Sequence, residues 1–415
     1  MRNPTFFLIL IGIMLVLEIY VFQALKMVVP PTSPRVRMAL TVIYWLFAVL
    51  VVGAFIAMVY FNYDSWPKSA RVYVLAIVVG TFFSLVVASL FLVVDDIRRG
   101  ATWIIVRMFR NPAPGTEADA EKITRSVFMS WMGLIFGGGL FSTLIYGFSN
   151  KYNYTVRRVV LNYSNLPEAF RGLKIVQLSD IHSGSFMDKK AVQRGVEKVL
   201  EENPDLILFT GDLVNDYATE MVEYMDVFDK LKANMGVYSV LGNHDYGDYV
   251  RWPDAATKVA NLERLKNVHG LLGWTLLMNE NVIFERGDQR IALLGIENWS
   301  AKSNFPKHGR LDEAHAGTEH IPFKILMSHD PSHWDAEVRP QYSDIDLTLA
   351  GHTHGMQFGV EIPGFKWSPV QYMYKQWAGL YEEGNQKLYI NRGFGFIGYP
   401  GRVGILPEIT VITLT

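Results

Sequence analysis

The sequence predicts two regions of different fold class: a multi-pass α-helical transmembrane bundle, followed by an α/β domain. Of the 415 residues, 50% are hydrophobic and the mean hydropathy is +0.14, which is more apolar than a typical soluble enzyme. The apolar residues are concentrated in the first third of the chain, where charges are sparse. From about Leu173 onward, short apolar runs end in polar clusters instead. The two regions therefore face different solvents.

Four apolar stretches are long enough to cross a bilayer. A helix needs roughly 20 apolar residues to do so, because every backbone amide must be hydrogen-bonded within the segment. We expect a transmembrane domain at residues 1–149, with helices at about 6–29, 36–61, 72–94 and 127–148. The first stretch is too long for a cleavable signal peptide and lacks a small-residue cleavage site. A linker is expected at 150–171 and the α/β domain at 172–415.

Three features of the membrane region carry expectations of their own. Glu18 lies inside the first apolar run, where a carboxyl group usually faces a partner or water, so we expect it to hydrogen-bond within the bundle. Gly133 and Gly137, extended by Gly138 and Gly139, have the small-xxx-small spacing that permits close helix contact. The segment Ala101–Arg110 mixes large apolar residues with arginine, which is typical of a helix lying along the membrane surface.

Charge distribution predicts the orientation of the chain. An even number of crossings places the N-terminus and the α/β domain on the same side of the membrane. Slightly more Lys and Arg lie in the loops after the first and third helices than on the opposite side. Because retained positive charge favours the cytoplasm, we expect the α/β domain to be extracytoplasmic.

Overall charge and cysteine content exclude several classes of function. The formal net charge of -1 and pI near 6.8 provide no field that would gather polyanions, so no nucleic acid partner is expected. The sequence has no cysteine, which excludes disulfides, thiolate nucleophiles and Cys-ligated metals. Any metal must therefore be bound by His, Asp, Glu or Asn.

The second region repeats one pattern five times: an apolar strand, a Gly or Ser turn, and then Asp, Asn or His. The predicted strands are Leu173–Leu178, Leu206–Phe209, Val237–Val240, Phe323–Met327 and Ile345–Leu349. A helix is expected at Lys189–Glu201, ending before Asn203-Pro204. Open α/β folds place their ligand chemistry at the carboxyl ends of strands, where the loops converge. Five strands thus direct residues of the metal-binding type to one place.

These strand ends carry a recognisable set of motifs. They are Asp180-x-His182, Gly211-Asp212, Gly242-Asn243-His244-Asp245, His329 and Gly351-His352-x-His354. In order and spacing they resemble the signature of the calcineurin-like metallophosphoesterases, over a region from Leu173 to the C-terminus. Gln177–His182 and Asn391–Gly395 are similar to the bacterial membrane-associated branch of that family. Met356 departs from the pattern, because relatives usually carry a second glycine after the His-x-His turn.

The resemblance implies a fold and a two-metal centre. The fold is a sandwich of two mixed β-sheets between helices. One cation would be held by Asp180, His182 and His354, the other by Asn243, His329 and His352, with Asp212 bridging both. Oxygen and imidazole ligands of this kind suit Mn, Fe or Zn. A pair of divalent transition metal ions lowers the pKa of a shared water and neutralises phosphate oxygens, so that a metal-bridging hydroxide attacks phosphorus.

Four further residues receive predicted roles beside the metals. His244 is expected near the leaving oxygen as the general acid, with Asp245 fixing its tautomer, and the alternative is a purely structural pair. Arg392 and Arg402 lie in glycine-rich turns and are candidates for binding substrate phosphate. Structural pairing of these arginines with carboxylates is the alternative. The five histidines outside the motifs are expected to be solvated or scaffold residues.

Residues 358–381 are rich in aromatic side chains, including Trp367, Tyr372, Tyr374, Trp377 and Tyr381. Amphipathic aromatic residues favour the membrane interface, so this segment would rest on the bilayer or hold an acyl chain beside the metals. Ordinary packing of a long loop over the core is the other interpretation.

The predicted protein is thus a multi-pass enzyme, expected in a bacterial cytoplasmic membrane, that hydrolyses a phosphoester or pyrophosphate bond. Anchoring restricts it to substrates that reach the membrane face, which favours a lipid or lipid-linked phosphate. One alternative is a phosphodiesterase that acts on soluble nucleotides. An alternative of a different class is a non-catalytic metal-binding membrane sensor or scaffold.

Overall fold

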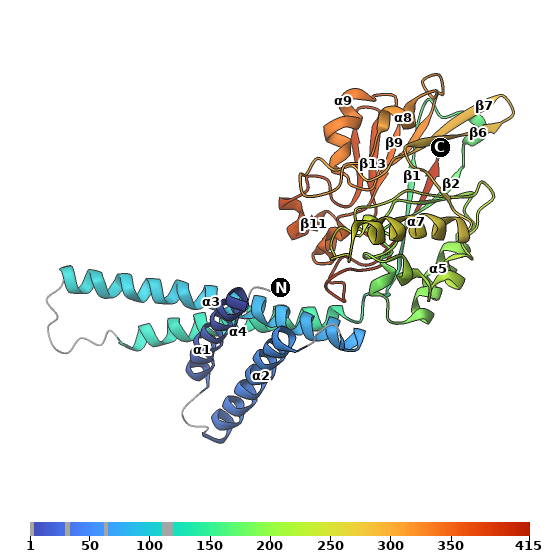
Figure 1. Ribbon diagram of the computed structural model, residues 1–415. Coiled ribbons are helices and arrows are strands. Elements are labelled where there is room, and N and C mark those ends of the chain that lie inside the picture. The colour runs from blue at the N-terminus through green and yellow to red at the C-terminus, as the bar shows by residue number, and fades with distance from the viewer. Residues whose placement is uncertain (1–3, 30–33, 62–64, 110–118) are drawn as a thin grey trace. The chain divides into compact units, whose positions relative to one another are not determined.

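The computed structural model describes residues 4–29, 34–61, 65–109 and 119–415 (Figure 1). The chain divides into two compact units, which we call unit 1, Met1–Tyr146, and unit 2, Gly147–Thr415.

Unit 1 is built from apolar helices. They are α1 (Pro4–Val28), α2 (Pro34–Tyr60), α3 (Lys68–Phe109) and α4 (Asp119–Gly147). Within the described residues, all four contain stretches long and apolar enough to cross a membrane. The four predicted spans are therefore confirmed as helices.

Helix α3 is longer than the sequence suggested. The predicted span ended at Val94, whereas α3 continues without a break to Phe109. At about 1.5 Å per residue this helix is roughly 60 Å long, twice the thickness of the hydrocarbon core. The extension begins with Asp95, which forms ion pairs with Arg98 and Arg99 one turn later. Residues 101–109 thus belong to α3 rather than to a separate surface helix, and Arg110 lies outside the described residues.

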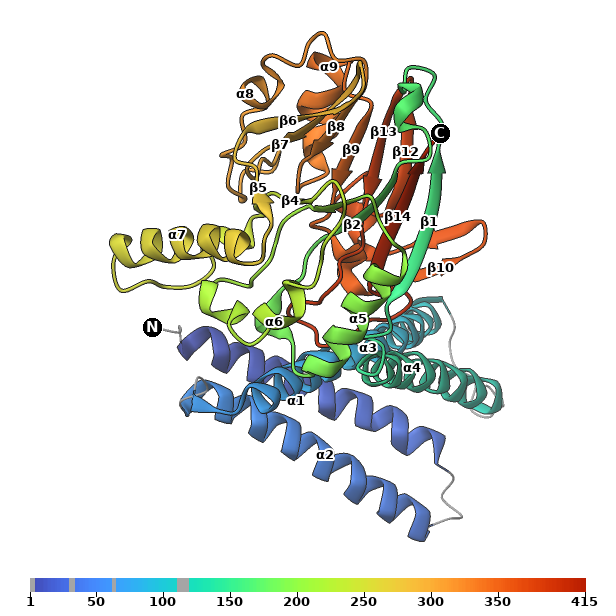
Figure 2. The same cartoon turned by 90° about the vertical axis from the view of Figure 1, so that its right-hand side faces the viewer.

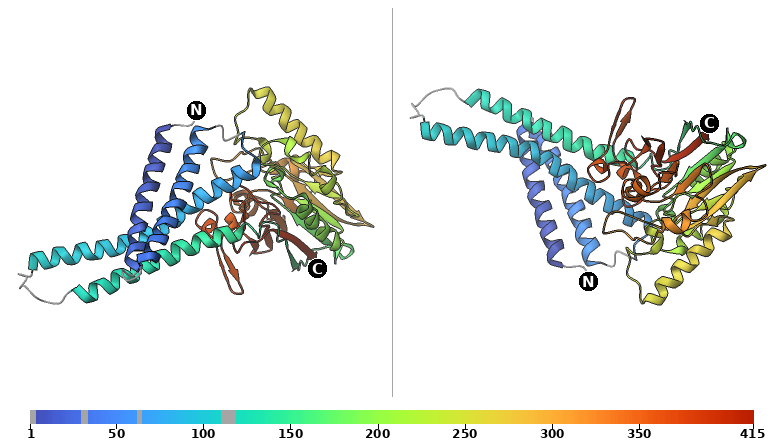
Figure 3. Two further views of the ribbon diagram at one scale, coloured as in Figure 1. Left: turned by 90° about the horizontal axis from the view of Figure 1, so that it is seen from below. Right: turned by 90° about the horizontal axis from the view of Figure 1, so that it is seen from above.

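Helices α3 and α4 run side by side in unit 1 (Figure 3). A Cβ atom at Gly133 would lie 2.8 Å from the carbonyl oxygen of Ala88, and one at Gly137 would lie 2.7 Å from that of Ser84. The two glycines therefore let the helix backbones touch, as predicted, while Gly138 and Gly139 have open space around their Cβ positions. Glu18 is buried inside the bundle, and its Oε1 has no hydrogen-bond partner among the described residues.

Unit 2 contains two six-stranded mixed sheets and a separate hairpin (Figure 2). The first sheet has the order β1-β14-β2-β3-β4-β5 and the second β12-β13-β9-β8-β7-β6, while β10 and β11 pair only with each other. The strands are β1 Thr155–Leu161, β2 Lys174–Leu178, β3 Leu206–Phe209, β4 Val237–Ser239, β5 Thr275–Leu276, β6 Glu280–Arg286, β7 Gln289–Gly295, β8 Lys324–Met327, β9 Leu347–Ala350, β10 Val360–Ile362, β11 Phe365–Trp367, β12 Gly379–Glu383, β13 Gln386–Ile390 and β14 Glu408–Leu414. The helices of unit 2 are α5 Lys189–Glu201, α6 Met225–Phe228, α7 Ala255–Leu271, α8 Leu311–His315 and α9 Arg339–Gln341.

The predicted linker, 150–171, is largely part of this domain. Residues 155–161 form β1, which pairs in parallel with β14 along its whole length, from Thr155–Glu408 to Leu161–Leu414. The β-branched residues of this segment favour a strand, but its pairing with the last strand of the chain has no local signal in the sequence.

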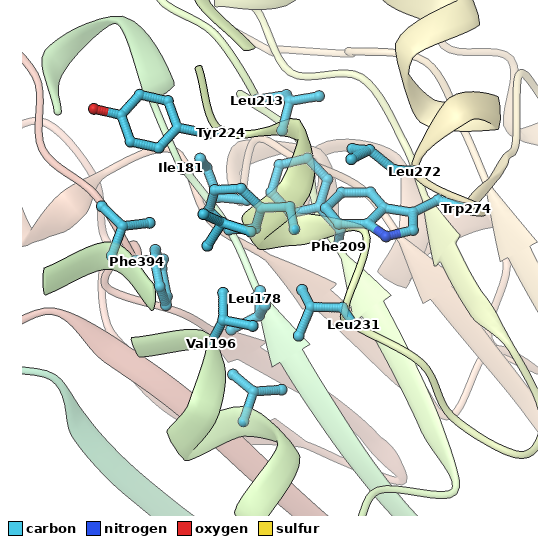
Figure 4. Close-up of a cluster of buried hydrophobic side chains, with 14 of the residues drawn as sticks. Leu178, Ile181, Val196, Phe209, Leu213, Tyr224, Leu231, Leu272, Trp274 and Phe394 are labelled. Atoms are coloured by element: carbon cyan, nitrogen blue, oxygen red, sulfur yellow. The ribbon is translucent and has the colours of Figure 1, made fainter. Parts of the chain in front are cut away.

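Three apolar layers hold unit 2 together. The central layer lies between the sheets and joins Ile175 and Leu208 of the first to Leu293 and Leu347 of the second. A second layer packs β2 and β3 against α5 and α7 (Figure 4). The third layer packs α8 and the turn Trp334–Val338 against the second sheet. The predicted sandwich of two mixed sheets between helices is therefore confirmed.

Helix α5 shows how the sequence sets this packing. Asp188 caps its first turn by accepting a hydrogen bond from the Ala191 backbone N–H at 3.0 Å. Val192, Val196 and Val199 recur at helical spacing and are all buried against the first sheet.

The five strands predicted to carry ligands are present, with ends that differ by at most two residues from expectation. Strands β2, β3 and β4 are mutually parallel, and so are β7, β8 and β9. The carboxyl ends of β2–β4 thus open at one edge of the first sheet, and those of β8 and β9 at one edge of the second.

Candidate metal centre

The loops after β2, β3, β4, β8 and β9 bring the seven predicted metal ligands together in one buried site. Asp180, His182 and His354 form one group of candidate ligand atoms, and Asp212, His329 and His352 form another. Within each group these atoms lie within 4.8 Å of one another. The three residues of each group come from at least two different loops, so the site exists only in the folded domain.

Asp212 belongs to the second group and also approaches the first. Its Oδ2 is 3.2 Å from His329 Nε2 and 3.5 Å from His182 Nε2. Its Oδ1 accepts a hydrogen bond from the backbone N–H of His244 at 2.8 Å, which fixes the carboxylate plane. One oxygen of Asp212 therefore faces both groups at once.

Asn243 completes the second group through its amide oxygen. Oδ1 is 2.7 Å from His352 Nδ1, while Nδ2 donates to the Tyr249 hydroxyl at 2.7 Å. The contact with Tyr249 thus holds the amide with its oxygen toward the site.

The first group is held in a similar way. His182 Nε2 and His354 Nε2 are 3.1 Å apart, and His354 Nε2 is 3.2 Å from Asp180 Oδ1. Both oxygens of Asp180 accept from the backbone N–H of His352 at 3.0 Å. A Cβ atom at Gly351 would collide with Asp180 Oδ2, which explains the glycine of that motif.

The backbone is strained at most of the candidate ligands. The φ angles of Asp180, His182, Asp212, His352 and His354 lie between 48° and 71°. This left-handed region costs a residue other than glycine roughly 1–2 kcal/mol. Met356, which stands where relatives usually carry glycine, has a φ of 55°. Strain of this kind persists where the surrounding fold imposes it and is concentrated at functional sites.

Burial makes this cluster of charges unfavourable unless a cation is present. Burial raises the pKa of Asp180 to about 6 and lowers the pKa of His182 to about 3. Burial also opposes charge on His329, but the carboxylate of Asp212 outweighs it and raises the pKa of His329 to about 10. His329 Nδ1 lies 2.7 Å from the Thr210 carbonyl, which leaves the buried Nε2 facing Asp212 Oδ2 at 3.2 Å. Carboxylate, amide and imidazole donors in this arrangement fit divalent cations.

The structure corrects the predicted role of Asp245. Its carboxylate does not contact the His244 ring but accepts four backbone N–H groups, those of Asp212, Leu213, Val214 and Gly242, at 2.8–3.2 Å. The ring of His244 is instead oriented by the Asn215 carbonyl, 2.8 Å from Nδ1. Asp245 thus shapes the loop that carries Asp212, and a carboxylate already bound to four N–H groups has no capacity left for an imidazole.

His244 is only partly buried and lies at the mouth of the site. Its ring centroid is 5.0 Å from that of His182, and Tyr249 packs on it with centroids 4.4 Å apart. With Nδ1 facing the Asn215 carbonyl, Nε2 is the ring nitrogen that can exchange a proton, and the general-acid role stays a prediction.

Sequence motifs did not reveal the residues that orient His352. Its Nε2 is 2.8 Å from the Tyr374 hydroxyl, which in turn donates to Asp330 Oδ2 at 3.4 Å. Phe305 packs edge-on against the imidazole, with ring centroids 4.8 Å apart. The position of Asp330 directly after a motif histidine is a signal in the sequence for a role at the site, whereas Phe305 and Tyr374 lie far from any motif.

The contacts of Arg392 and Arg402 favour the structural alternative over substrate binding. Arg392 is 2% exposed and forms ion pairs with Glu361 and Glu408. Arg402 is fully buried and donates to the backbone carbonyls of His354, Arg392, Gly393 and Gly395. Neither guanidinium group has donors directed to an open surface.

We therefore expect Arg392→Ala to destabilise unit 2 rather than to weaken substrate binding. The substitution removes the closer cation of the buried Glu408 carboxylate and leaves Arg157 Nε, 3.8 Å away. Breaking a buried pair of this kind costs about 3–5 kcal/mol. Thermal unfolding of the variant, compared with the exposed control Arg264→Ala, measures the effect. A raised KM at an unchanged melting temperature would restore the substrate-binding role.

Three of the five histidines outside the motifs make scaffold contacts, and His308 and His320 are exposed, so the expectation of solvated or scaffold residues is met. His269 pairs with Ser239 and His333 with Ser328, both at 2.9 Å, and His315 Nε2 lies 2.8 Å from Asp344.

Comparison with known proteins finds one family match in each unit. Residues 1–151 match the family described as "Probable Calcineurin-like phosphoesterase, transmembrane domain", and residues 173–356 match "Calcineurin-like phosphoesterase". The second match covers all seven candidate ligands, from Asp180 to His354.

Similar proteins occur in animals and in bacteria. The chain is 32% identical to a "Transmembrane protein with metallophosphoesterase domain" of Danio rerio, over 62% of this chain and 56% of that protein. It is 29% identical to "Uncharacterized metallophosphoesterase YkuE" of Bacillus subtilis, over 71% of this chain and 98% of that protein. It is 28% identical to "Phosphodiesterase YaeI" of Escherichia coli, over 58% of this chain and 82% of that protein. The chain thus spans about half the length of the fish protein.

The apolar helices of unit 1 and the transmembrane family match together indicate an integral membrane protein. Residues 173–356 form a calcineurin-like phosphoesterase domain, and they follow residues 1–151, which match the transmembrane domain described for probable calcineurin-like phosphoesterases.

Proposed function

We propose that this protein hydrolyses a phosphoester or pyrophosphate bond in a lipid or lipid-linked substrate, with two divalent transition metal ions, Mn, Fe or Zn. The convergence of the two ligand groups on Asp212 carries the proposal. Asp180, His182 and His354 would hold one cation, and Asn243, His329 and His352 the other, with Asp212 shared between them. Such a pair of cations supplies charge neutralisation for phosphate oxygens and acidifies a water molecule.

The residues of the chain around this site would then bind, orient and protonate the substrate. His244 lies at the mouth with Nε2 available, so it would give a proton to the leaving oxygen. Asp245 holds the Asp212 loop through backbone N–H groups, and Tyr249 holds the Asn243 amide. Tyr374 and Asp330 hold His352 from the side away from Asn243. Supporting contacts of this type keep ligands in register and strengthen metal binding.

The membrane anchor favours substrates that lie in or at the membrane. A hydrolase domain joined to spanning helices meets substrates at the membrane face at far higher local concentration than soluble ones. We further propose that the chain lies in a bacterial cytoplasmic membrane with the hydrolase domain outside, as the loop charges favour.

A second candidate is a phosphodiesterase that acts on soluble nucleotides, and the relative from Escherichia coli, named as a phosphodiesterase, favours a phosphodiester bond. A non-catalytic sensor is less well supported, because all seven candidate ligands and His244 are present and lie together.

The substrate class can be tested directly with the full-length protein in nanodiscs. Supplied with Mn²⁺, it should release phosphate or a phosphorylated headgroup from a bacterial lipid extract, scored by mass spectrometry against the Asp212→Ala variant. Aryl phosphomonoesters and diesters serve as soluble reporters. Turnover of soluble nucleotides but of no lipid would favour the second candidate. Two bound metals without turnover of any of these substrates would favour the sensor.

A further inference from the structure

Exposed apolar side chains are clustered in one segment of unit 2. Of its thirteen large hydrophobic side chains that are exposed, six lie within residues 356–373. We call these six the apolar edge: Met356, Val360, Ile362, Phe365, Tyr372 and Met373. Soluble proteins rarely expose contiguous patches of this kind, and such patches usually mark a contact surface.

The apolar edge is built around the β10–β11 hairpin, which projects from the two large sheets (Figure 2). Ile362 and Phe365 face each other across the turn, and Val360 pairs with Trp367. Trp367 Nε1 lies 3.5 Å from the Tyr372 hydroxyl, which joins the hairpin to residues 372 and 373. The exposed side chains therefore form one surface rather than isolated sites.

The same segment has a firmly packed base. Tyr374 and Trp377 are buried with Val370, Ala378 and Ile405, and Ser368 Oγ donates to the Gly355 carbonyl at 2.8 Å. Ordinary packing over the core therefore accounts for the base of the aromatic segment, whereas the apolar edge faces outward. A fixed base that presents exposed apolar groups is typical of a contact surface and not of a loose loop.

The charges of this segment suit a lipid surface. The only carboxylate between residues 356 and 375 is Glu361, and it is paired with Arg157 and Arg392 at 2.7 Å. Lys366 binds the Ala378 carbonyl in the packed base, and Lys375 Nζ lies 3.6 Å from Asp335 Oδ2. Headgroups would therefore meet apolar side chains, and no unpaired carboxylate of residues 356–375 would repel anionic ones.

A bilayer is within reach of this surface because of the covalent connection. Residues 148–154 join the end of α4 to the start of β1, and a chain of that length spans at most about 25 Å when fully extended. A helix that crosses the membrane thus keeps unit 2 beside a bilayer at all times.

We propose that the apolar edge inserts into the interfacial layer of the bilayer in which the chain is anchored. Amphipathic elements of this composition are buried about 5–10 Å into the headgroup region. The contact would place the metal centre at the lipid surface, since Met356 follows His354 by two residues and the Tyr374 hydroxyl lies 2.8 Å from His352 Nε2. This consequence rests on the proposed function and specifies its substrate as an amphipathic lipid phosphate that remains in the bilayer.

Site-directed fluorescence tests the contact without any need for turnover. The sequence has no cysteine, so Ile362→Cys and Phe365→Cys can each be labelled at a single site with an environment-sensitive dye. Leu271→Cys and Val222→Cys are matched controls, because these apolar side chains are 74% and 73% exposed and lie outside the apolar edge. The full-length protein is placed in nanodiscs that contain nitroxide-labelled lipids.

We expect blue-shifted emission at 362 and 365 that is quenched several-fold more strongly by lipid nitroxides than emission at 222 and 271. Water-like emission at both edge positions, in protein that retains its metals, would overturn the proposal. Blue-shifted emission without lipid quenching would also overturn it, because it would indicate a protein partner such as a second copy.

A second measurement separates this proposal from the proposed function. Ile362→Asp with Phe365→Asp should lower turnover of lipid phosphate in vesicles by about tenfold or more, while turnover of soluble aryl phosphate stays unchanged. Val222→Asp should change neither. Equal turnover of vesicle lipid by the double variant and the wild type would contradict bilayer contact. Lipid quenching in a protein that cleaves no phosphate would support the bilayer contact, and it would refute only the proposed enzymatic function.

Discussion

Asp212→Asn should lower turnover by at least about 10³-fold, equivalent to roughly 4 kcal/mol of lost transition-state stabilisation, and should reduce metal content. Asp212 Oδ2 is the atom that faces both ligand groups, at 3.2 and 3.5 Å from His329 and His182. An asparagine can keep accepting the His244 backbone N–H, so the loop retains its shape while the negative charge disappears. Turnover of aryl phosphate and metal content by mass spectrometry would be measured on the same preparation.

The exposed Asp288→Ala serves as the control, because Asp288 lies in the turn between β6 and β7, away from the candidate ligands. Wild-type metal content and turnover in Asp212→Asn would remove the residue from the centre and, with it, the shared-ligand arrangement. In excess metal, Asp212→Asn should also melt at a lower temperature than the wild type, because bound metal stabilises the folded state.

His244→Ala should lower turnover by roughly 10²–10⁴ while both metals remain bound. The imidazole lies at the mouth of the site with Nδ1 facing the Asn215 carbonyl, and it supplies none of the seven candidate ligand atoms. A general acid matters most when the leaving group is poor. The loss should therefore be larger for an alkyl phosphate than for p-nitrophenyl phosphate.

His320→Ala, an exposed histidine outside the site, is the matched control. Equal losses for alkyl and aryl substrates would argue against proton donation. Loss of metal from His244→Ala would make the residue a part of the binding site rather than of the proton transfer.

The loop after β4 carries His244 and Asp245 next to each other, and the two side chains contact different groups. His244 is partly exposed, whereas Asp245 turns inward and binds the backbone of the Asp212 loop. Burial and the neighbouring Asp212 charge raise the pKa of Asp245 to about 7, and hydrogen bonds from backbone N–H groups oppose this rise. Adjacent residues of one short motif thus face different surroundings, and Asp245 serves the scaffold.

Local chemistry was enough to predict much of this protein. In a bilayer, the backbone N–H and C=O groups of a single long apolar segment can find hydrogen-bond partners only within a helix. The length and composition of the apolar runs therefore predicted the four helices of unit 1. Short apolar strands followed by Gly-Asp, Asn-His or His-x-His turns identified the loops that converge on the metal centre. Ligand type and strand position are properties of a few adjacent residues, and the linear sequence displays them.

The sequence did not show which residues far apart in the chain contact one another. Arg392 pairs with Glu361 and Glu408, β1 pairs with β14, and Tyr374 holds His352, and none of these contacts leaves a local pattern. Several side chains could have satisfied Asp245 or His244 equally well, and the choice depends on which backbone groups the folded loops present. Residue types and their order therefore set which chemistry is possible, while the packing of loops from both sheets selects the atom that each group contacts.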